Sequence, residues 1–268
     1  MLDRFIMSYL FNPTDQLDNF IQPESNVICA TILTGIYDVN RNERLEADQF
    51  LHVEKWHQSI VSLQLKGIIF HNTFSQKTIQ TYQNEFITFV EVAYDQRFNP
   101  NVFRYLIYQD FIHQYRHAIA NLFVTDISDV EVIQNPFVQP LFIENLTALF
   151  CGDEPKPLNN DWMNAHNSHL RQSIAGFANY EQQHQAETLL NCGIIGGSMF
   201  TMQTLMDQLA QIHRTYTIHN QTPYTLDMGA FNYVARTQFA NHLHHGAPVN
   251  TVFKAYESER IDCWFRHK

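Results

Sequence analysis

The sequence predicts an α/β protein with a mostly parallel central sheet flanked by helices. Over the first half of the chain, apolar runs rich in β-branched residues alternate with segments whose apolar residues recur at helical spacing. This alternation is typical of parallel sheets that are covered on both faces. The chain has 268 residues, 45% of them hydrophobic, which is enough for a sizeable core. Because no repeat, low-complexity tract or Pro/Gly linker divides the sequence, we expect a single domain over residues 1–268.

The first half supplies most of the expected sheet. The apolar run 26–34 predicts a buried strand, and the following segment 35–38 carries a loop signal. Further strands are expected at 67–70, 86–92 and 120–125, and helices at 47–65, 75–82 and 101–115, the last of them amphipathic. A serine cap supports the helix at 75–82. Ligands of such sheets bind at the carboxyl ends of the strands, so Thr34–Gly35 and Thr125–Asp126 are expected side by side.

The second half is less regular. Residues 146–151 predict a strand, and the polar segment 153–179 is expected to be loop with short helices. A strand at 188–195 runs into Gly196 and Gly197. Helices are expected at 199–214 and 226–239, and the tail 249–268 follows them.

The composition narrows the classes of function and the compartment. The formal net charge of −10 argues against nucleic-acid binding, which depends on Lys and Arg neutralising phosphates. The cysteines have no zinc-site spacing and are expected to be reduced core residues; they are Cys29, Cys151, Cys192 and Cys263. Neither a signal peptide nor a membrane span is evident. We therefore expect a cytoplasmic protein, with peripheral membrane contact as the only association with a bilayer.

Two acids at a predicted strand end form the first candidate site. The apolar run 122–124 leads directly to Asp126, and Asp129 follows three residues later. Side chains at positions i and i+3 of a strand point to opposite faces, so both carboxylates can reach one ion only if the backbone bends at Ile127–Ser128. Carboxylates suit Mg²⁺ or Mn²⁺. The alternative is that Asp126 caps the turn and Asp129 is solvated.

The acidic turn resembles that of nucleotide-sugar glycosyltransferases with the GT-A fold. The resemblance is greatest to a bacterial group that carries Thr-Asp-x-Arg-Asp-Val followed by Gln-x-Pro-Phe. Two departures from the family are evident: Ser128 stands where Arg is expected, and the commoner Asp-x-Asp spacing is absent. The matching residues are Thr125, Asp126, Asp129, Val130, Gln134, Pro136 and Phe137. The resemblance implies a Rossmann-like GT-A domain with a nucleotide-binding half at 1–137 and an acceptor-binding half at 138–268.

Further motifs agree with this resemblance in their order along the chain. Residues 34–38 look like the loop that holds the donor's base and ribose, and 191–197 are similar to a strand beneath the sugar and acceptor. The resemblance implies donor binding by Thr34, Gly35, Asp38, Arg104, Asp126 and Lys268. It implies metal binding by Asp126, Asp129 and His267, a role near the reacting centre for Asp227, and sugar or acceptor contacts by Asn191, Gly196 and Gly197.

Each of these residues also has a simpler interpretation. Gly196 and Gly197 would only form a tight turn, and Asp227 would only cap its helix. Arg104 would be a surface charge, and His267 a disordered residue of the tail. Trp162 is either a platform for a sugar or a buried or interface residue. The run His242, His244 and His245 invites a zinc site but has no further ligand at the right spacing, so a solvated or acceptor-side loop is expected.

The resemblance implies a metal-assisted transfer of a sugar from a nucleoside diphosphate sugar to a hydroxyl of a glycan or glycolipid acceptor, in polysaccharide or glycoconjugate biosynthesis. Mn²⁺ or Mg²⁺ would bridge the diphosphate. Asp227 would be the general base if the enzyme inverts the configuration, or a contact to acceptor or sugar if it retains it. A non-catalytic nucleotide- or sugar-binding protein on the same scaffold is the alternative. A metal-dependent hydrolase that uses the histidine run is a third hypothesis.

Overall fold

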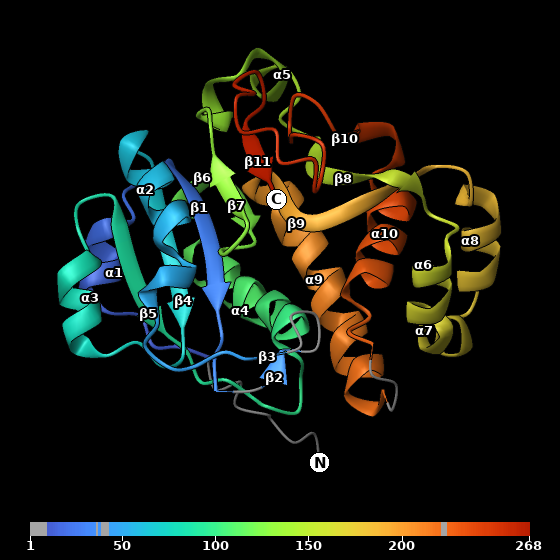
Figure 1. The fold of residues 1–268 in the computed structure, drawn as a ribbon, viewed down its shortest axis with the longest axis horizontal. Coiled ribbons are helices and arrows are strands. Elements are labelled where there is room, and N and C mark those ends of the chain that lie inside the picture. The colour runs from blue at the N-terminus through green and yellow to red at the C-terminus, as the bar shows by residue number, and fades with distance from the viewer. Residues whose placement is uncertain (1–9, 36, 39–42, 221–223) are drawn as a thin grey trace.

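The computed structural model describes residues 10–35, 37–38, 43–220 and 224–268. Its centre is a seven-stranded sheet in the order β10-β8-β9-β6-β1-β4-β5 (Figure 1). The strands are β1 (Ser25–Ile32), β4 (Lys66–His71), β5 (Ile87–Glu91), β6 (Ile119–Thr125), β8 (Leu149–Pro157), β9 (Thr188–Ser198) and β10 (Leu243–His245). Strands β6, β1, β4 and β5 are parallel, whereas β9 runs antiparallel to both β6 and β8. The predicted α/β class and mostly parallel sheet are confirmed.

Helices and short segments cover both faces of this sheet (Figure 1). Alternate residues of β1 divide between the two faces: Val27 and Cys29 pack in one core cluster, and Ile28 and Ala30 pack in the other. The α-helices are α1 (Asp15–Phe20), α2 (Glu54–Ser62), α3 (Gln76–Tyr82), α4 (Pro100–Tyr115), α5 (Pro140–Ile143), α6 (Asp161–His166), α7 (Ser168–Ser173), α8 (Phe177–His184), α9 (Met199–Tyr216) and α10 (Asp227–Gln238). Short 3-10 helices lie at Phe50–His52, Pro136–Val138, Thr217–His219 and Ala240–His242. No helix among the described residues is long and apolar enough to cross a lipid bilayer.

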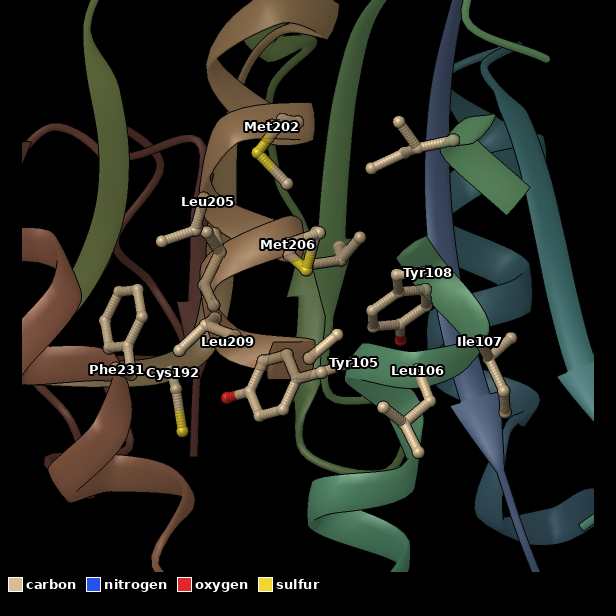
Figure 2. Packing of buried hydrophobic residues seen from close by; sticks show 14 of the residues in the cluster. Tyr105, Leu106, Ile107, Tyr108, Cys192, Met202, Leu205, Met206, Leu209 and Phe231 are labelled. Atoms are coloured by element: carbon tan, nitrogen blue, oxygen red, sulfur yellow. The ribbon is translucent and has the colours of Figure 1, made fainter. Parts of the chain in front are cut away.

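Helix α4 is buried on all sides from Val102 to Tyr108, so the prediction of an amphipathic helix holds only for its second half, where the polar residues 109, 110, 113 and 114 are half-buried. Its buried residues run from Val102 to Tyr115 and include Arg104. The reason is its position: Tyr108 and Phe111 of the helix pack against Phe70 of β4, and the helix also contacts α9. Figure 2 shows Tyr105 and Tyr108 of α4 beside Met206 of α9. A helical segment that is buried on all sides is typical of such an interior position.

Other boundaries differ from the expected ones for local reasons. Helix α2 begins only at Glu54 because Asp48 has a left-handed backbone (φ 58°) and accepts a hydrogen bond from the Ser75 amide (2.7 Å). The Ser75 hydroxyl accepts the Thr78 amide (3.2 Å), which confirms the predicted cap of α3. Strand β8 extends to Pro157, into a segment expected to be loop, because it pairs with β9 along this length.

Several short elements were not expected from the sequence. Strand β10 adds the histidine run to the edge of the sheet beside β8. Strand β11 (Phe265–His267) pairs antiparallel with β7 (Val130–Val132), which follows the acidic turn. A third small pair joins β2 (Tyr37–Asp38) to β3 (Glu43–Arg44). The pairing of β11 with β7 brings the tail of the chain to the acidic turn.

Candidate functional site

The acidic turn bends as a shared ion site requires. Strand β6 ends at Thr125, whose hydroxyl accepts the indole N–H of Trp56 (2.7 Å). The Asp126 amide then donates to the Gly193 carbonyl (2.7 Å) before β7 begins at Val130. The backbone bends at residues 127–129, between Asp126 and Val130, as the hypothesis of a shared ion requires.

His267 is ordered and buried, with only 1% of its surface exposed. It pairs with Val130 across the β7–β11 ladder, and its amide donates to the Thr251 hydroxyl (3.2 Å). Its ring packs edge-on against Phe253 (4.5 Å between centroids). The interpretation of His267 as a disordered tail residue is therefore wrong.

Asp126, Asp129 and His267 converge. Each offers a ligand atom, and these atoms all lie within 4.8 Å of one another. In the part of the chain that the structure describes, no other group of three or more His, Cys, Asp or Glu side chains lies close enough together to hold one metal ion. Burial lowers the pKa of His267, although Asp126 and Glu154 act in the opposite direction. A lowered pKa favours the neutral imidazole, which is the form that binds metals.

Gly193 forms the floor of this cluster. A Cβ atom there would lie 2.5 Å from His267 Cε1, 2.7 Å from Asp126 Oδ2 and 2.9 Å from Asn191 Oδ1. Only glycine leaves room for the three side chains. Gly193 was not among the predicted site residues, although it belongs to the glycine-rich segment 191–197.

The donor set fits a divalent cation. Two carboxylates and one imidazole suit Mn²⁺, and Mg²⁺ to a lesser degree. The Nδ1 atom of His267 is buried and has no hydrogen-bond partner among the described residues. The other ring nitrogen, Nε2, lies 3.9 Å from Asp129 Oδ2, so it is the nitrogen that faces the carboxylates.

Arg104 is part of the site and is not a surface charge. The residue is 6% exposed, and its guanidinium is ion-paired with Asp126 Oδ1. The second terminal nitrogen, Nη2, lies 3.6 Å from Asp227 Oδ2 and 3.1 Å from Cys192 Sγ. Burial opposes the charge of Arg104, but Tyr105, Asp126, Cys192 and Asp227 outweigh it and raise the pKa of the guanidinium.

Two adjoining cavities meet at Arg104 and Asp126. The first has a volume of about 380 Å³ and is lined by residues 31–33, Leu45, His52 and 126–129. The second, of about 340 Å³, is lined by Glu154, Lys156, Trp162, Asn191, Cys192, Thr225, Asp227 and Met228. Both are also lined by Asn101, Arg104, Asp126, Phe253 and Lys254. A ligand with two parts therefore has two compartments joined beside the acidic cluster.

Besides Arg104 and Asp126, the second cavity collects three further predicted residues. Asp227 opens α10 but does not cap it: its oxygens engage the Thr225 hydroxyl (2.5 Å) and Arg104. Asn191 donates to Glu154 Oε1 (2.9 Å). Trp162 is 41% exposed at the rim, with Lys156 Nζ 5.4 Å from the centre of its ring. Trp162 is thus not a buried core residue.

The predicted nucleotide loop lies beside the first cavity. The amide of Thr34 donates to Asn72 Oδ1 (2.9 Å), and its hydroxyl is hydrogen-bonded to that of Thr73. Gly35 has a left-handed backbone (φ 86°) that suits glycine. The cavity lining comes from the preceding residues 31–33. The side chain of Asp38 and all of Ile36 lie outside the described residues.

Gly196 and Gly197 line neither cavity. They belong to β9, so the tight-turn interpretation is wrong. A Cβ at Gly196 would lie 2.1 Å from the Phe123 ring, and one at Gly197 would lie 2.8 Å from the Ala148 carbonyl oxygen. Their role in the structure is close packing of the sheet.

Lys268 is engaged away from the cavities. Its ammonium is ion-paired with Glu131, which also binds Arg266 (2.8 Å). The lysine that lines both cavities is Lys254, which was not among the predicted site residues. No motif marks it in the sequence, and its left-handed backbone (φ 60°) arises only from the turn of the tail.

The histidine run does not form a metal site. His245 Nδ1 is hydrogen-bonded to Asp153 Oδ2 (2.8 Å), and His244 stacks on Phe150 (5.2 Å between centroids). These contacts attach β10 to the sheet edge, which corrects the expectation of a solvated loop.

The four cysteines are buried, as predicted, and none is paired in a disulfide. No known protein-family model matches the chain, and no curated protein is significantly similar to it.

Proposed function

We propose that this protein is a metal-assisted glycosyltransferase of the GT-A type that transfers a sugar from a nucleoside diphosphate sugar to an acceptor hydroxyl. The observation that carries the proposal is the convergence of Asp126, Asp129 and His267, because Asp126 also lines both cavities and Asp129 lines the first. A donor of this class has a nucleoside, a diphosphate and a sugar, and the acceptor is a separate molecule. Two compartments joined at a cation site match these requirements.

In this proposal the donor occupies the first cavity. Residues 31–33 and His52 line the part that would hold the nucleoside. Asp126, Asp129 and His267 would hold the divalent ion, whose charge stabilises the departing diphosphate. Lys254 replaces Lys268 as the lysine that faces the phosphates, because the ammonium of Lys268 is bound by Glu131.

The acceptor occupies the second cavity, whose lining includes the polar side chains of Asp227 and Asn191; Asp227 Oδ2 lies 3.6 Å from Arg104 Nη2. In the reaction, the bond between the sugar's anomeric carbon and the phosphate oxygen breaks, and a bond to the acceptor oxygen forms. The nucleoside diphosphate leaves with the electron pair. The acceptor hydroxyl's proton passes to Asp227 if the configuration inverts, or to the departing phosphate oxygen if it is retained.

A non-catalytic nucleotide- or sugar-binding protein is the second candidate. Asp227, the proposed base, is engaged on one oxygen by Thr225 and approached on the other by Arg104. A carboxylate held in this way suits a binding role as well. Incubation with a panel of UDP- and GDP-sugars without acceptor separates the two candidates, because a transferase slowly releases free nucleotide and a pure binder releases none.

Calorimetric titration with UDP and GDP, each with and without Mn²⁺, tests the ion site. We expect at least one nucleotide to bind, more tightly with Mn²⁺, and Asp129→Asn to abolish the effect of Mn²⁺. Asp207→Asn is the matched control, since Asp207 is ion-paired with His113 on the outer side of α4 and α9. Nucleotide binding that ignores Mn²⁺, or an Asp129→Asn variant that responds like the wild type, contradicts the proposed ion site.

A further inference from the structure

We infer that Arg104 is an internal competitor of the divalent ion, and that Asp227 in the second cavity tunes ion binding by sharing the charge of Arg104. This inference rests on the ion site of the proposed function. It assigns to Arg104 a positioning and regulatory role that links the two cavities.

The two oxygens of Asp126 face different partners. Oδ1 is ion-paired with the buried guanidinium of Arg104. Oδ2 lies above Gly193 beside the His267 ring, since a Cβ on Gly193 would approach Oδ2 to 2.7 Å and His267 Cε1 to 2.5 Å. One carboxylate therefore serves both the cation cluster and the arginine.

Arg104 is shared in turn between two acids. It pairs with Asp126, and Nη2 lies 3.6 Å from Asp227 Oδ2. The side-chain exposure of Arg104 is 7% and that of Asp227 is 8%. Screening by solvent is weak at such buried groups, so their charges interact strongly.

The competition follows from the signs of these charges. A divalent cation bound to Asp126 Oδ2 is repelled by the Arg104 guanidinium on Oδ1. The metal ion and the guanidinium also share the single negative charge of the Asp126 carboxylate, so each weakens the attraction of the other to it. Asp227 reduces this repulsion by neutralising Arg104 from the second cavity. Arg104 hence weakens ion binding, and Asp227 strengthens it through Arg104.

The Mn²⁺ dissociation constant, measured by the EPR signal of free Mn²⁺ without nucleotide, tests the inference. Arg104→Gln removes the competing charge and is expected to tighten Mn²⁺ binding by about tenfold. This change is a small part of the unscreened Coulomb repulsion between the guanidinium and a divalent ion bound to the same carboxylate. Arg104→Lys keeps the charge and should remain close to the wild type. Asp227→Asn leaves Arg104 neutralised by Asp126 alone and should weaken binding by about threefold.

A double-mutant cycle separates this linkage from a general field effect of Asp227. In the Arg104→Gln background, Asp227→Asn should change the dissociation constant by less than a factor of about 1.5, because its route of action is gone. Arg236→Gln is the control for a lost buried arginine: Arg236 is also ion-paired, with Glu187, and lies outside both cavities. It should lower stability and leave Mn²⁺ affinity unchanged.

Circular dichroism verifies that each variant is folded. Weaker Mn²⁺ binding by Arg104→Gln, or an equal effect of Asp227→Asn in both backgrounds, overturns the inference. If Arg104→Gln does not fold, Asp227→Asn alone decides, and an unchanged dissociation constant overturns it. A wild-type protein that binds no Mn²⁺ at all contradicts the proposed function instead, so the two failures are distinguishable.

Discussion

The amide of Lys268 donates a hydrogen bond to the carbonyl oxygen of Asp129 over 2.9 Å. Two segments separated by more than a hundred residues are thereby held edge to edge, and the neighbouring His267 is directed toward Asp126 and Asp129. The geometry of the candidate ion site thus depends on main-chain pairing as well as on the three side chains.

Gly193 and Gly196 should respond differently to the same substitution. Gly193→Ala places a methyl group within 2.7 Å of His267 Cε1 and Asp126 Oδ2, so we expect Mn²⁺ affinity to fall by about tenfold or more, as for a site displaced by about 1 Å. Gly196→Ala meets the Phe123 ring and should cost about 1–3 kcal/mol of unfolding free energy through overpacking. Mn²⁺ titration and urea denaturation of both variants test this pair, and equal effects on Mn²⁺ affinity would falsify the placement of Gly193.

Lys254 and Lys268 provide a second matched pair. Lys254→Ala removes the lysine that lines both cavities, and nucleoside diphosphate affinity should fall by about tenfold, the value of one charge-assisted hydrogen bond. Lys268→Ala removes only the partner of Glu131 and should leave nucleotide affinity unchanged. Calorimetry with the better-binding nucleotide measures both, and a larger loss for Lys268→Ala would restore the original prediction from the sequence.

The stability of the protein should decrease in mild acid because His71 is buried. Burial lowers the pKa of His71 from 6.5 to about 4, and Nδ1 accepts the Phe74 amide (3.1 Å). Between these two pKa values the unfolded chain binds a proton at His71 that the folded chain does not. The free energy of unfolding therefore decreases as the pH falls from about 6.5 to 4. The full loss is about 3 kcal/mol. Urea denaturation between pH 7.5 and 4.5 measures this slope.

His71→Asn keeps an acceptor for the Phe74 amide and removes the titrating group. Its stability should depend less on pH over this range than that of the wild type. The exposed His117→Asn is the control and should keep the wild-type slope. Parallel slopes for wild type and His71→Asn would show that other groups cause the acid sensitivity.

Trp162 should report ligands of the second cavity by fluorescence. Trp56 and Trp264 are fully buried, whereas Trp162 is 41% exposed at the rim. Uncharged methyl glycosides that enter the cavity are expected to change the emission of the wild type and to leave that of Trp162→Phe unchanged. Glycosides that bind by calorimetry without changing the wild-type emission would place the acceptor elsewhere.

The parallel part of the sheet was predictable because its strands carry a local signal. Runs such as 26–34 and 120–125 are apolar and β-branched, and the serine cap at Ser75 marks the start of α3. Asp126 was predictable for the same reason, since it follows such a run. These features depend on neighbours in the sequence, which a single sequence displays.

The remaining site depends on register and tertiary pairing. Thr125 pairs with Ile194 and Phe123 pairs with Gly196, so Gly193 lies at the site and Gly196 lies against Phe123. The register between β6 and β9 therefore determines which glycine reaches the site, and the pattern of glycines in the sequence does not reveal that register. Lys254 lines both cavities, whereas Lys268 is bound by Glu131 and lines neither. The burial of Arg104 arises from the packing of α4 between sheet and α9, which the helix sequence does not specify.

The ladder between β7 and β11 makes the candidate ion site sensitive to local opening of the chain. Each of the two strands has three residues, and such short pairings open at a much lower free energy than the central sheet. Separation of β11 would carry His267 away from Asp126 and Asp129 while the seven-stranded sheet stays intact. Ligands that bind only the form with β11 paired to β7 would selectively slow amide exchange at Phe265–His267. Separation of β11 would inactivate the site well before the protein unfolds.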